Sequence, residues 1–379
     1  MESLPSKNIP TKALVVDKPN APFILEDVVL DEVRENELLV EIKYSGICHT
    51  DLVIQQGKMP IGGFPVVAGH EGAGIILRLG GGLEGSGLRE GDRVILGFAS
   101  CMSCSACRKG SKGACANIAL TNFGGTRGLD DTSIRRPNGD FVRGPVFGQS
   151  SFSKLAVCDA RTVVKYPGPV EDLSFLAPLG CGFMTGAGTV MDVLKPQSSS
   201  SIAILGLGAV GLCALMAAKS LNVAEIVAID IVDSRLELAK CLGATHALDG
   251  RKYRDIEAAI REASTHGVDY IVDTTGLISA INSGIKALAQ RGTLAIVGTP
   301  PPRECLSAEA MDMLIHCKKI IGITGAYANP QELIPRLVKM FKEGSFPISS
   351  LSKTYPSTEI EQAIKDMKSG KVVKPVLAW

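Results

Sequence analysis

Four cysteines packed into a short segment are the clearest chemical signal in this sequence. They form a C-x2-C-x2-C-x7-C run within fifteen residues, made by Cys101, Cys104, Cys107 and Cys115. Zinc favours soft sulfur ligands, and four thiolates at this density can close a tetrahedral site. The alternative is a set of buried or redox-active thiols without metal. We therefore expect a structural zinc site here.

A second set of soft ligands is spread along the chain. Cys48, His70 and Cys181 are far apart in sequence. Two thiolates and one imidazole would leave the fourth zinc position open for water or a substrate oxygen. Taken alone, His70 could equally be a satisfied core histidine. Asp51 and Glu71 lie beside these ligands and are candidates for the groups that orient the imidazole and tune the charge of the metal.

A glycine-rich turn supplies a third signal. The sequence GLGAVG at 206–211 follows the apolar run 202–205 and opens a helical pattern, and Asp230 stands nineteen residues after Gly211. A lone G-x-G-x-x-G is weak, but a strand before it and a helix after it are the context required for a dinucleotide site. The glycines allow a pyrophosphate to approach the helix N-terminus. A purely structural turn is the alternative.

The acidic residue after the second strand bears on the choice of dinucleotide. Asp230 would accept hydrogen bonds from the ribose hydroxyls and repel a 2′-phosphate, which favours NAD over NADP. Arg235 lies close by in sequence and is a complication, because a cation can tolerate that phosphate.

The elements that must position these residues change character along the chain. Residues 1 to about 180 form short strand patterns separated by glycine-rich turns, and later residues alternate strands with helices of ten to fifteen residues, which indicates a parallel, doubly wound sheet. Expected strands are 13–16, 37–43, 93–96, 202–205, 226–229, 270–272, 294–297 and 372–377. Expected helices are 209–221, 234–242, 279–289, 330–342 and 357–368. The tail could rejoin the first domain.

Composition limits the class of protein. The chain has 379 residues, enough for two domains, and its net charge of +1 gives no sign of a nucleic-acid or membrane partner. A secretory signal and an apolar run of 18 residues are not visible, so we expect a cytoplasmic protein. Its eleven cysteines would then stay reduced, and clustered ones are more often metal ligands than disulfides.

These motifs together resemble one family. The segments 46–51 and 69–71 with Gly74 and Gly80, the four-cysteine run, the segment 181–186 and the glycine-rich turn occur in the order of the zinc-dependent medium-chain alcohol dehydrogenases. The resemblance extends from about residue 10 to the C-terminus. It implies an α/β chain with a GroES-like β catalytic domain at 1–183 and 324–379, and a Rossmann cofactor domain with a doubly wound parallel sheet at 184–323.

The resemblance also implies roles for single residues. Cys48, His70 and Cys181 match the catalytic zinc ligands, and the four-cysteine run the structural ones. Glu71 matches a carboxylate behind the catalytic zinc, and Thr50 a hydroxyl that binds the substrate oxygen and relays its proton. The expected cofactor contacts are His49, Thr185, Gly206, Gly208, Val210, Gly211, Asp230, Arg235, Val297 and Lys374. Candidate walls of the substrate pocket, or else ordinary turn and core residues, are Phe147 and Thr299.

One departure refines the resemblance. Family members carry a histidine three residues after the relay hydroxyl, where this chain has Val53. The aryl (benzyl) alcohol dehydrogenase branch also lacks that histidine. The sequence is therefore interpreted as an enzyme with two zinc ions per subunit and NAD(H), which reversibly oxidises a primary aromatic or allylic alcohol to an aldehyde. By the same resemblance a homodimer is expected, with a homotetramer as the alternative.

Three other functions stay open. A biosynthetic reductase of an aldehyde, an iminium or a conjugated double bond could use the same fold. A polyol dehydrogenase is less favoured, because that branch usually replaces the third zinc ligand by glutamate and this chain keeps Cys181. A zinc-stabilised nucleotide-binding module without activity is the third alternative.

Overall fold

The chain folds into two compact units. The computed structural model describes residues 4–59, 63–124, 127 and 131–379. The first unit comprises Met1–Cys181, Asn329–Val338 and Ile348–Trp379, and the second Gly182–Ala328 and Lys339–Pro347. The division after Cys181 lies two residues before the predicted boundary at 183. The segment Lys339–Pro347, expected in the first domain, groups with the second unit.

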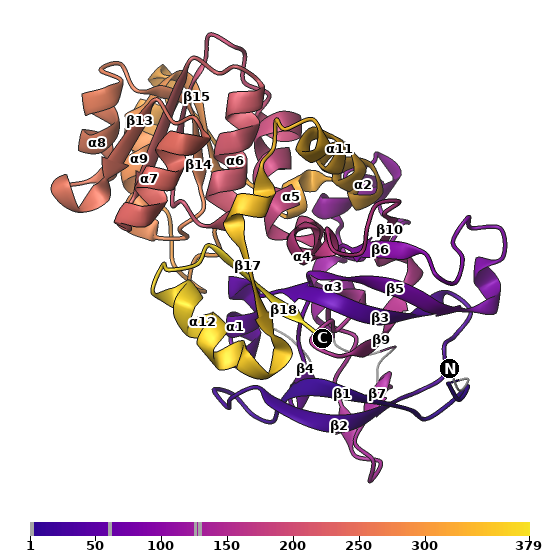
Figure 1. Cartoon of the computed structure of the whole chain (residues 1–379). Helices are drawn as coiled ribbons and strands as arrows, with labels where there is room; N and C mark the ends of the chain where they lie inside the picture. The colour runs from indigo at the N-terminus through magenta and orange to yellow at the C-terminus, as the bar shows by residue number, and fades with distance from the viewer. Residues whose placement is uncertain (1–3, 60–62, 125–126, 128–130) are drawn as a thin grey trace. The chain divides into compact units, whose positions relative to one another are not determined.

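Two sheets build the first unit (Figure 1). The five-stranded sheet runs in the order β4 (Val66–Val67), β1 (Ile9–Val16), β2 (Ile24–Leu30), β7 (Ile134–Arg135) and β8 (Phe141–Val142). The seven-stranded sheet runs in the order β10 (Val163–Lys165), β6 (Arg93–Leu96), β5 (Gly72–Leu79), β3 (Glu37–Gly46), β18 (Lys374–Ala378) and β17 (Ser352–Pro356), with β9 (Leu155–Asp159) paired to β3. The C-terminal strand thus completes a sheet of the first unit.

The sequence of β3 explains its central place. Leu38, Val40 and Ile42 alternate along the strand and belong to one hydrophobic cluster, whereas Leu39 belongs to another. Successive side chains point to opposite faces of a strand, so β3 is covered by apolar side chains on both faces. The helices of this unit are short: α1 (His49–Gln55), α2 (Ser105–Arg108), α3 (Ile118–Phe123), α4 (Leu173–Leu176) and α12 (Ile360–Lys368), with α11 (Pro330–Lys342) beginning in it.

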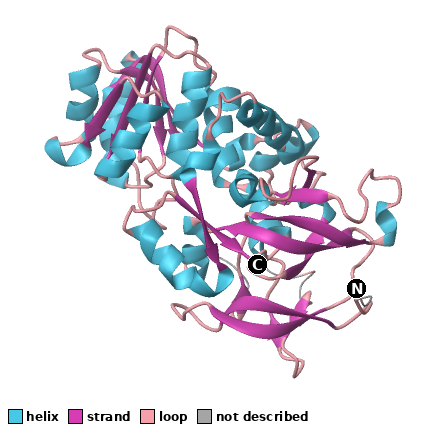
Figure 2. Ribbon diagram, in the orientation of Figure 1, coloured by secondary structure: helices cyan, strands magenta, loops and turns pink. Residues whose placement is uncertain are grey.

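The second unit contains a six-stranded parallel sheet with helices packed against it (Figure 2). Its order is β13 (His246–Asp249), β12 (Glu225–Asp230), β11 (Ser201–Leu205), β14 (Val268–Asp273), β15 (Leu288–Ile296) and β16 (Lys319–Gly322). Its helices are α5 (Gly182–Gly188), α6 (Ala209–Ser220), α7 (Asp233–Leu242), α8 (Ile256–Ala263), α9 (Ile278–Ala287) and α10 (Ala310–Ile315). This strand order is that of a dinucleotide-binding Rossmann fold, so the predicted doubly wound sheet is confirmed.

Among the described residues, no single helix is long and apolar enough to cross a membrane. One bent pair, Leu173–Gly180 with Gly182–Leu194, meets the criterion only when its two helices are taken together.

Candidate active site

Three expected zinc ligands meet in the first unit. Cys48 is the N-cap of α1, His70 lies just before β5, and Cys181 follows a 3-10 turn. Their ligand atoms, with a carboxylate oxygen of Glu71, all lie within 4.8 Å of one another. The fold therefore gathers two neighbouring ligands, Cys48 and His70, with Cys181, which lies more than a hundred residues further along the sequence. Such a set matches the donors of a catalytic zinc with an open position.

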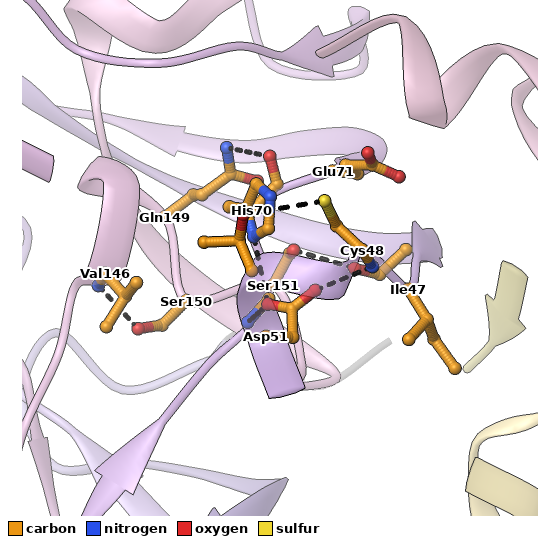
Figure 3. A network of polar contacts seen from close by, with 12 residues as sticks. Ile47, Cys48, Asp51, His70, Glu71, Val146, Gln149, Ser150 and Ser151 are labelled. Atoms are coloured by element: carbon orange, nitrogen blue, oxygen red, sulfur yellow. Dashed lines mark hydrogen bonds and ion pairs between the residues drawn. The ribbon is translucent and has the colours of Figure 1, made fainter. Parts of the chain in front are cut away.

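One buried carboxylate orients two of these ligands. The backbone N–H of Cys48 donates to Asp51 Oδ2 at 2.9 Å, as expected for a residue that caps α1. His70 Nδ1 and the backbone N–H of Gly69 donate to Asp51 Oδ1 at 2.9 and 3.0 Å (Figure 3). Because the carboxylate holds the Nδ1 proton, Nε2 is the ring nitrogen left to bind a metal.

The second ring nitrogen of His70 faces a ligand sulfur. His70 is fully buried, and its imidazole hydrogen-bonds to the Cys48 thiol, as the dashed line in Figure 3 shows. A divalent cation bound by Nε2 and the two sulfur atoms would take the place of this proton. Two sulfur donors and one imidazole fit zinc.

The surroundings of the two thiols shift their pKa values in opposite directions. A hydrogen bond from Cys181 and the nearby His70 lower the pKa of Cys48 well below its usual value, although burial opposes this. The same contact with Cys48 and burial raise the pKa of Cys181. Burial disfavours a charged His70, but Asp51 and Cys48 outweigh it and raise its pKa. A divalent cation would displace these protons when it binds.

A buried ion pair lies behind the ligands. Lys374 Nζ donates to both carboxylate oxygens of Glu71, at 3.0 and 2.9 Å, and to the carbonyl of Ile47 at 3.1 Å. Burial raises the pKa of Glu71 to about 7, against the opposing effect of the Lys374 ammonium. A Cβ at Gly46 would lie 2.1 Å from Glu71 Oε2, so the pair depends on that glycine.

Lys374, expected at a cofactor phosphate, has its ammonium group inside the first unit. An ammonium has three N–H donors, and here three oxygen atoms accept from it. We therefore propose that Lys374 neutralises Glu71.

Other expected residues lie beside the ligands. The Thr50 hydroxyl oxygen is 3.7 Å from Cys48 Sγ, and His49 is exposed. The Phe147 ring stacks on the His70 imidazole, with a centroid distance of 4.5 Å and an interplanar angle of 25°. Phe123 meets Phe147 edge-on at 4.9 Å. Sequence reasoning missed Phe123, because nothing in its local pattern indicates this contact.

The four-cysteine run also forms a compact cluster. Its four sulfur atoms lie within 4.8 Å of one another. Backbone N–H groups point at them: that of Cys104 to Cys101 Sγ, and those of Cys101 and Asn117 to Cys115 Sγ, each at 3.4 Å. Hydrogen bonds from Ser103 and the Cys104 amide lower the pKa of Cys101 to about 5. Four sulfur donors supported by amide groups fit a closed zinc site.

The glycine-rich turn of the second unit fits a dinucleotide. Gly206 has φ +84°, which favours glycine, and a Cβ at Gly211 would lie 1.9 Å from the Gly206 carbonyl oxygen. A Cβ at Gly208 would meet none of the described residues within 4 Å, so the backbone at the N-terminus of α6 is open to a ligand.

Asp230 shapes the same turn. Its Oδ2 accepts the Leu207 N–H at 2.6 Å, and its Oδ1 accepts the N–H groups of Ile231 and Val232 at 2.7 and 2.9 Å. Arg235 lies 3.8 Å from Oδ2 as an ion pair, so its charge is balanced by Asp230. The carboxylate thus links the glycine turn to the end of β12.

The remaining expected residues of the second unit are spread over three elements. Thr185 on α5 and Val210 on α6 are half-buried, and a Cβ at Gly186 would lie 2.0 Å from the Val210 carbonyl oxygen, so α5 and α6 pack closely. Val297 donates its backbone N–H to the Asp273 carbonyl at 2.9 Å, and Thr299 is exposed beyond β15.

Comparisons with known proteins identify the family. A model described as alcohol dehydrogenase GroES-like domain matches residues 34–168, and one described as zinc-binding dehydrogenase matches residues 209–343. The chain belongs to the zinc-binding alcohol dehydrogenases. The predicted family and the predicted pairing of GroES-like and Rossmann domains are thereby confirmed, and the chain is an oxidoreductase that uses zinc and NAD(H).

Individual relatives cover almost the whole dehydrogenase. A geraniol dehydrogenase of Castellaniella defragrans is 36% identical over 372 residues, 98% of each chain. The crystal structure of benzyl alcohol dehydrogenase from Acinetobacter calcoaceticus has a TM-score of 0.91 at 36% identity and covers 97% of this chain and 99% of that one. An alcohol dehydrogenase zinc-binding domain protein from Burkholderia ambifaria reaches 0.94 at 38% identity, with 98% and 99% covered.

Proposed function

We propose that this dehydrogenase reversibly oxidises primary alcohols, aromatic or allylic ones above all, to aldehydes with NAD as hydride acceptor. The observation that carries the proposal is the buried His70 Nε2 between two thiols, oriented by Asp51 through the opposite ring nitrogen. The substrate class is supported by relatives named for geraniol, an allylic alcohol, and benzyl alcohol.

The residues of the chain divide the work. Cys48, His70 and Cys181 would hold the zinc ion, which would supply Lewis acidity toward an alcohol hydroxyl, and NAD would supply the hydride acceptor. Thr50, whose hydroxyl lies beside Cys48, accepts the proton of the alcohol and passes it on. Val53 offers no acceptor three residues later, so the proton leaves by a route without a histidine there.

Zinc content and turnover test the assignment of the ligands. The wild-type protein should hold two zinc ions per chain and oxidise benzylic and allylic alcohols with a higher kcat/KM than aliphatic ones. Cys48→Ala should retain one zinc ion and lose turnover, whereas the control Cys241→Ala, at an exposed cysteine of α7, should keep both. Full activity of Cys48→Ala would exclude zinc catalysis at this site.

Cofactor preference and reaction direction separate the alternatives. Asp230 predicts a higher kcat/KM with NAD than with NADP, and the reverse preference would contradict the assignment. Product analysis with NADH and aldehydes, iminium ions or conjugated enones distinguishes an alcohol dehydrogenase from a biosynthetic reductase. We also propose a cytoplasmic homodimer, for which light scattering and cell fractionation are the tests.

A further inference from the structure

A buried loop segment lies against the backbone that carries His70. Its centre is Gln149, whose side chain is almost fully buried. Gln149 Oε1 accepts the Gly72 N–H at 2.9 Å, and Gln149 Nε2 donates to the carbonyls of His70 at 3.1 Å and Gly97 at 2.9 Å (Figure 3). One amide side chain thus holds the backbone on both sides of Glu71 and ties it to the end of β6.

The residues after Gln149 hold the chain that precedes His70. The backbone N–H of Ser151 donates to the Gly69 carbonyl at 2.9 Å, and that of Phe152 to the Ala68 carbonyl at 3.1 Å. The Ser150 hydroxyl donates to the Val67 carbonyl at 2.7 Å. The backbone from 67 to 72 is therefore bound at successive positions by the segment 149–152.

Phe147 acts on the imidazole itself. Rotation of the His70 ring about its Cβ–Cγ bond would pull Nδ1 away from Asp51, so this hydrogen bond holds one edge of the ring. The stacked Phe147 ring opposes this rotation, and Phe123 supports Phe147 from its edge. The two contacts together fix the direction of His70 Nε2.

The backbone of this loop adopts an unfavourable conformation to reach these contacts. Phe147 has φ +53° and Ser150 has φ +47°, in the left-handed region that non-glycine residues seldom occupy, and Gly148 between them has φ +67°. Strain of this kind persists where surrounding contacts determine the conformation, and it clusters at ligand clamps. The contacts of Gln149, Ser150 and Phe147 are those determinants.

We infer that Gln149 and Phe147 are positioning residues for His70, which act together with Asp51 to aim Nε2 at the catalytic zinc. The inference rests on the proposed role of His70 as a zinc ligand. In this role neither side chain touches the reacting atoms. Gln149 sets the position of the His70 backbone, and Phe147 sets the rotation of its ring.

Two variants and a matched control test the inference on the zinc-loaded protein. Gln149→Met keeps the length of the side chain without its hydrogen bonds, and Phe147→Leu removes the stacked ring from a half-buried position. The control is Gln331→Met, because Gln331 Nε2 also bridges two backbone carbonyls of the first unit, Arg161 at 2.8 Å and Val163 at 3.4 Å. We would follow the loss of zinc over time in the presence of the chelator dipicolinate, and record the visible spectrum of the cobalt-substituted protein. The values of kcat, KM and Tm complete the comparison.

Removal of a group that orients a metal ligand typically changes metal affinity by 10–100-fold. Both variants should therefore lose one of their two zinc ions at least about tenfold faster than wild type. Their cobalt absorption bands should shift, and kcat should fall more than KM rises. Gln331→Met should match wild type in zinc retention and spectrum. If Gln149→Met does not fold, Phe147→Leu alone decides the question.

If both variants had a lower Tm but kept the zinc retention and the cobalt spectrum of wild type, the two residues would have only a structural role. This result would overturn the inference and leave the proposed function intact. A wild-type protein that holds only one zinc ion would overturn the proposed function and the inference with it. The two failures are therefore distinguishable.

Discussion

The two sulfur-rich sites of the first unit are built in opposite ways. The four-cysteine site takes all its ligands from fifteen residues of one loop, and local backbone N–H groups stabilise its sulfur atoms. The second site joins Cys48, His70 and Cys181, and buried side chains such as Asp51 hold it. A local site can be formed by a short stretch of chain, whereas a distributed site exists only when the sheets around it are complete.

The two sites also differ in the groups that surround their sulfur atoms. Each site has two partly exposed cysteines, Cys101 and Cys104 in one and Cys48 and Cys181 in the other. Only the distributed site has fully buried titratable groups around its sulfur atoms, namely His70, Asp51 and Glu71. The distributed site therefore depends on buried polar groups that need partners, and its His70 Nε2 lies beside the Cys48 sulfur. Changes there should affect chemistry most, and changes in the four-cysteine site should affect stability most.

The largest effect is expected from His70→Ala. A catalytic metal supplies several kcal/mol of transition-state stabilisation, so kcat/KM should fall at least about a thousandfold. Zinc content should drop from two ions to one, because the four-cysteine site is independent. His246→Ala, at a half-buried histidine of β13, is the control and should keep both ions. Loss of both ions from His70→Ala would mean that the two sites are coupled.

Asp51→Asn should have the next largest effect. The amide cannot supply the negative charge that supports the imidazole, and groups of this kind typically change metal affinity or activity by about 10–100-fold. We expect weaker binding of one zinc ion in a competition with a chromogenic chelator, and a lower kcat. Asp27→Asn, at an exposed carboxylate, should behave as wild type. If Asp51→Asn and Asp27→Asn behaved alike, Asp51 would have no role in holding the zinc ligands.

The same contrast explains what the sequence predicted. The spacing of Cys101–Cys115 encodes a site by itself, and the strong helical pattern of 330–342 matches α11. Cys48, His70 and Cys181 were joined only by resemblance to a family, since nothing local connects them. Gln149 lies 79 residues from His70 and gave no signal, because its role arises from contacts between distant segments.

Some missed elements did have a local signal. Asp255 caps α8 through a hydrogen bond from the Ala258 N–H at 2.9 Å, and an acidic cap before an amphipathic run predicts a helix. The short edge strand β13 has only half-buried residues, so its pattern is weak. The buried partner of Lys374 could not be predicted, because Glu71 is 303 residues away.

Asp230→Ala changes neither zinc site and should therefore separate cofactor binding from metal binding. Loss of hydrogen bonds to ribose hydroxyls is worth about 1 kcal/mol or somewhat more, so kcat/KM with NAD should fall roughly tenfold and the preference over NADP should shrink. Two zinc ions per chain should remain. An unchanged ratio of kcat/KM for NAD and NADP would contradict the role of Asp230 in cofactor choice.

Cys115→Ser should have the smallest effect on catalysis and thus tests the comparison most sharply. Removing this thiolate leaves the N–H groups of Cys101 and Asn117 without their sulfur acceptor and opens the closed site. Because structural zinc contributes on the order of 10 kcal/mol of apparent folding free energy in small domains, Tm should fall by roughly 10 °C or more. Below that transition the variant should hold one zinc ion and keep kcat/KM within about twofold of wild type, because Asp51 and His70 stay in place. A fall in kcat/KM like that of His70→Ala, at a temperature where circular dichroism shows a folded chain, would mean that the four-cysteine loop also shapes the distributed site.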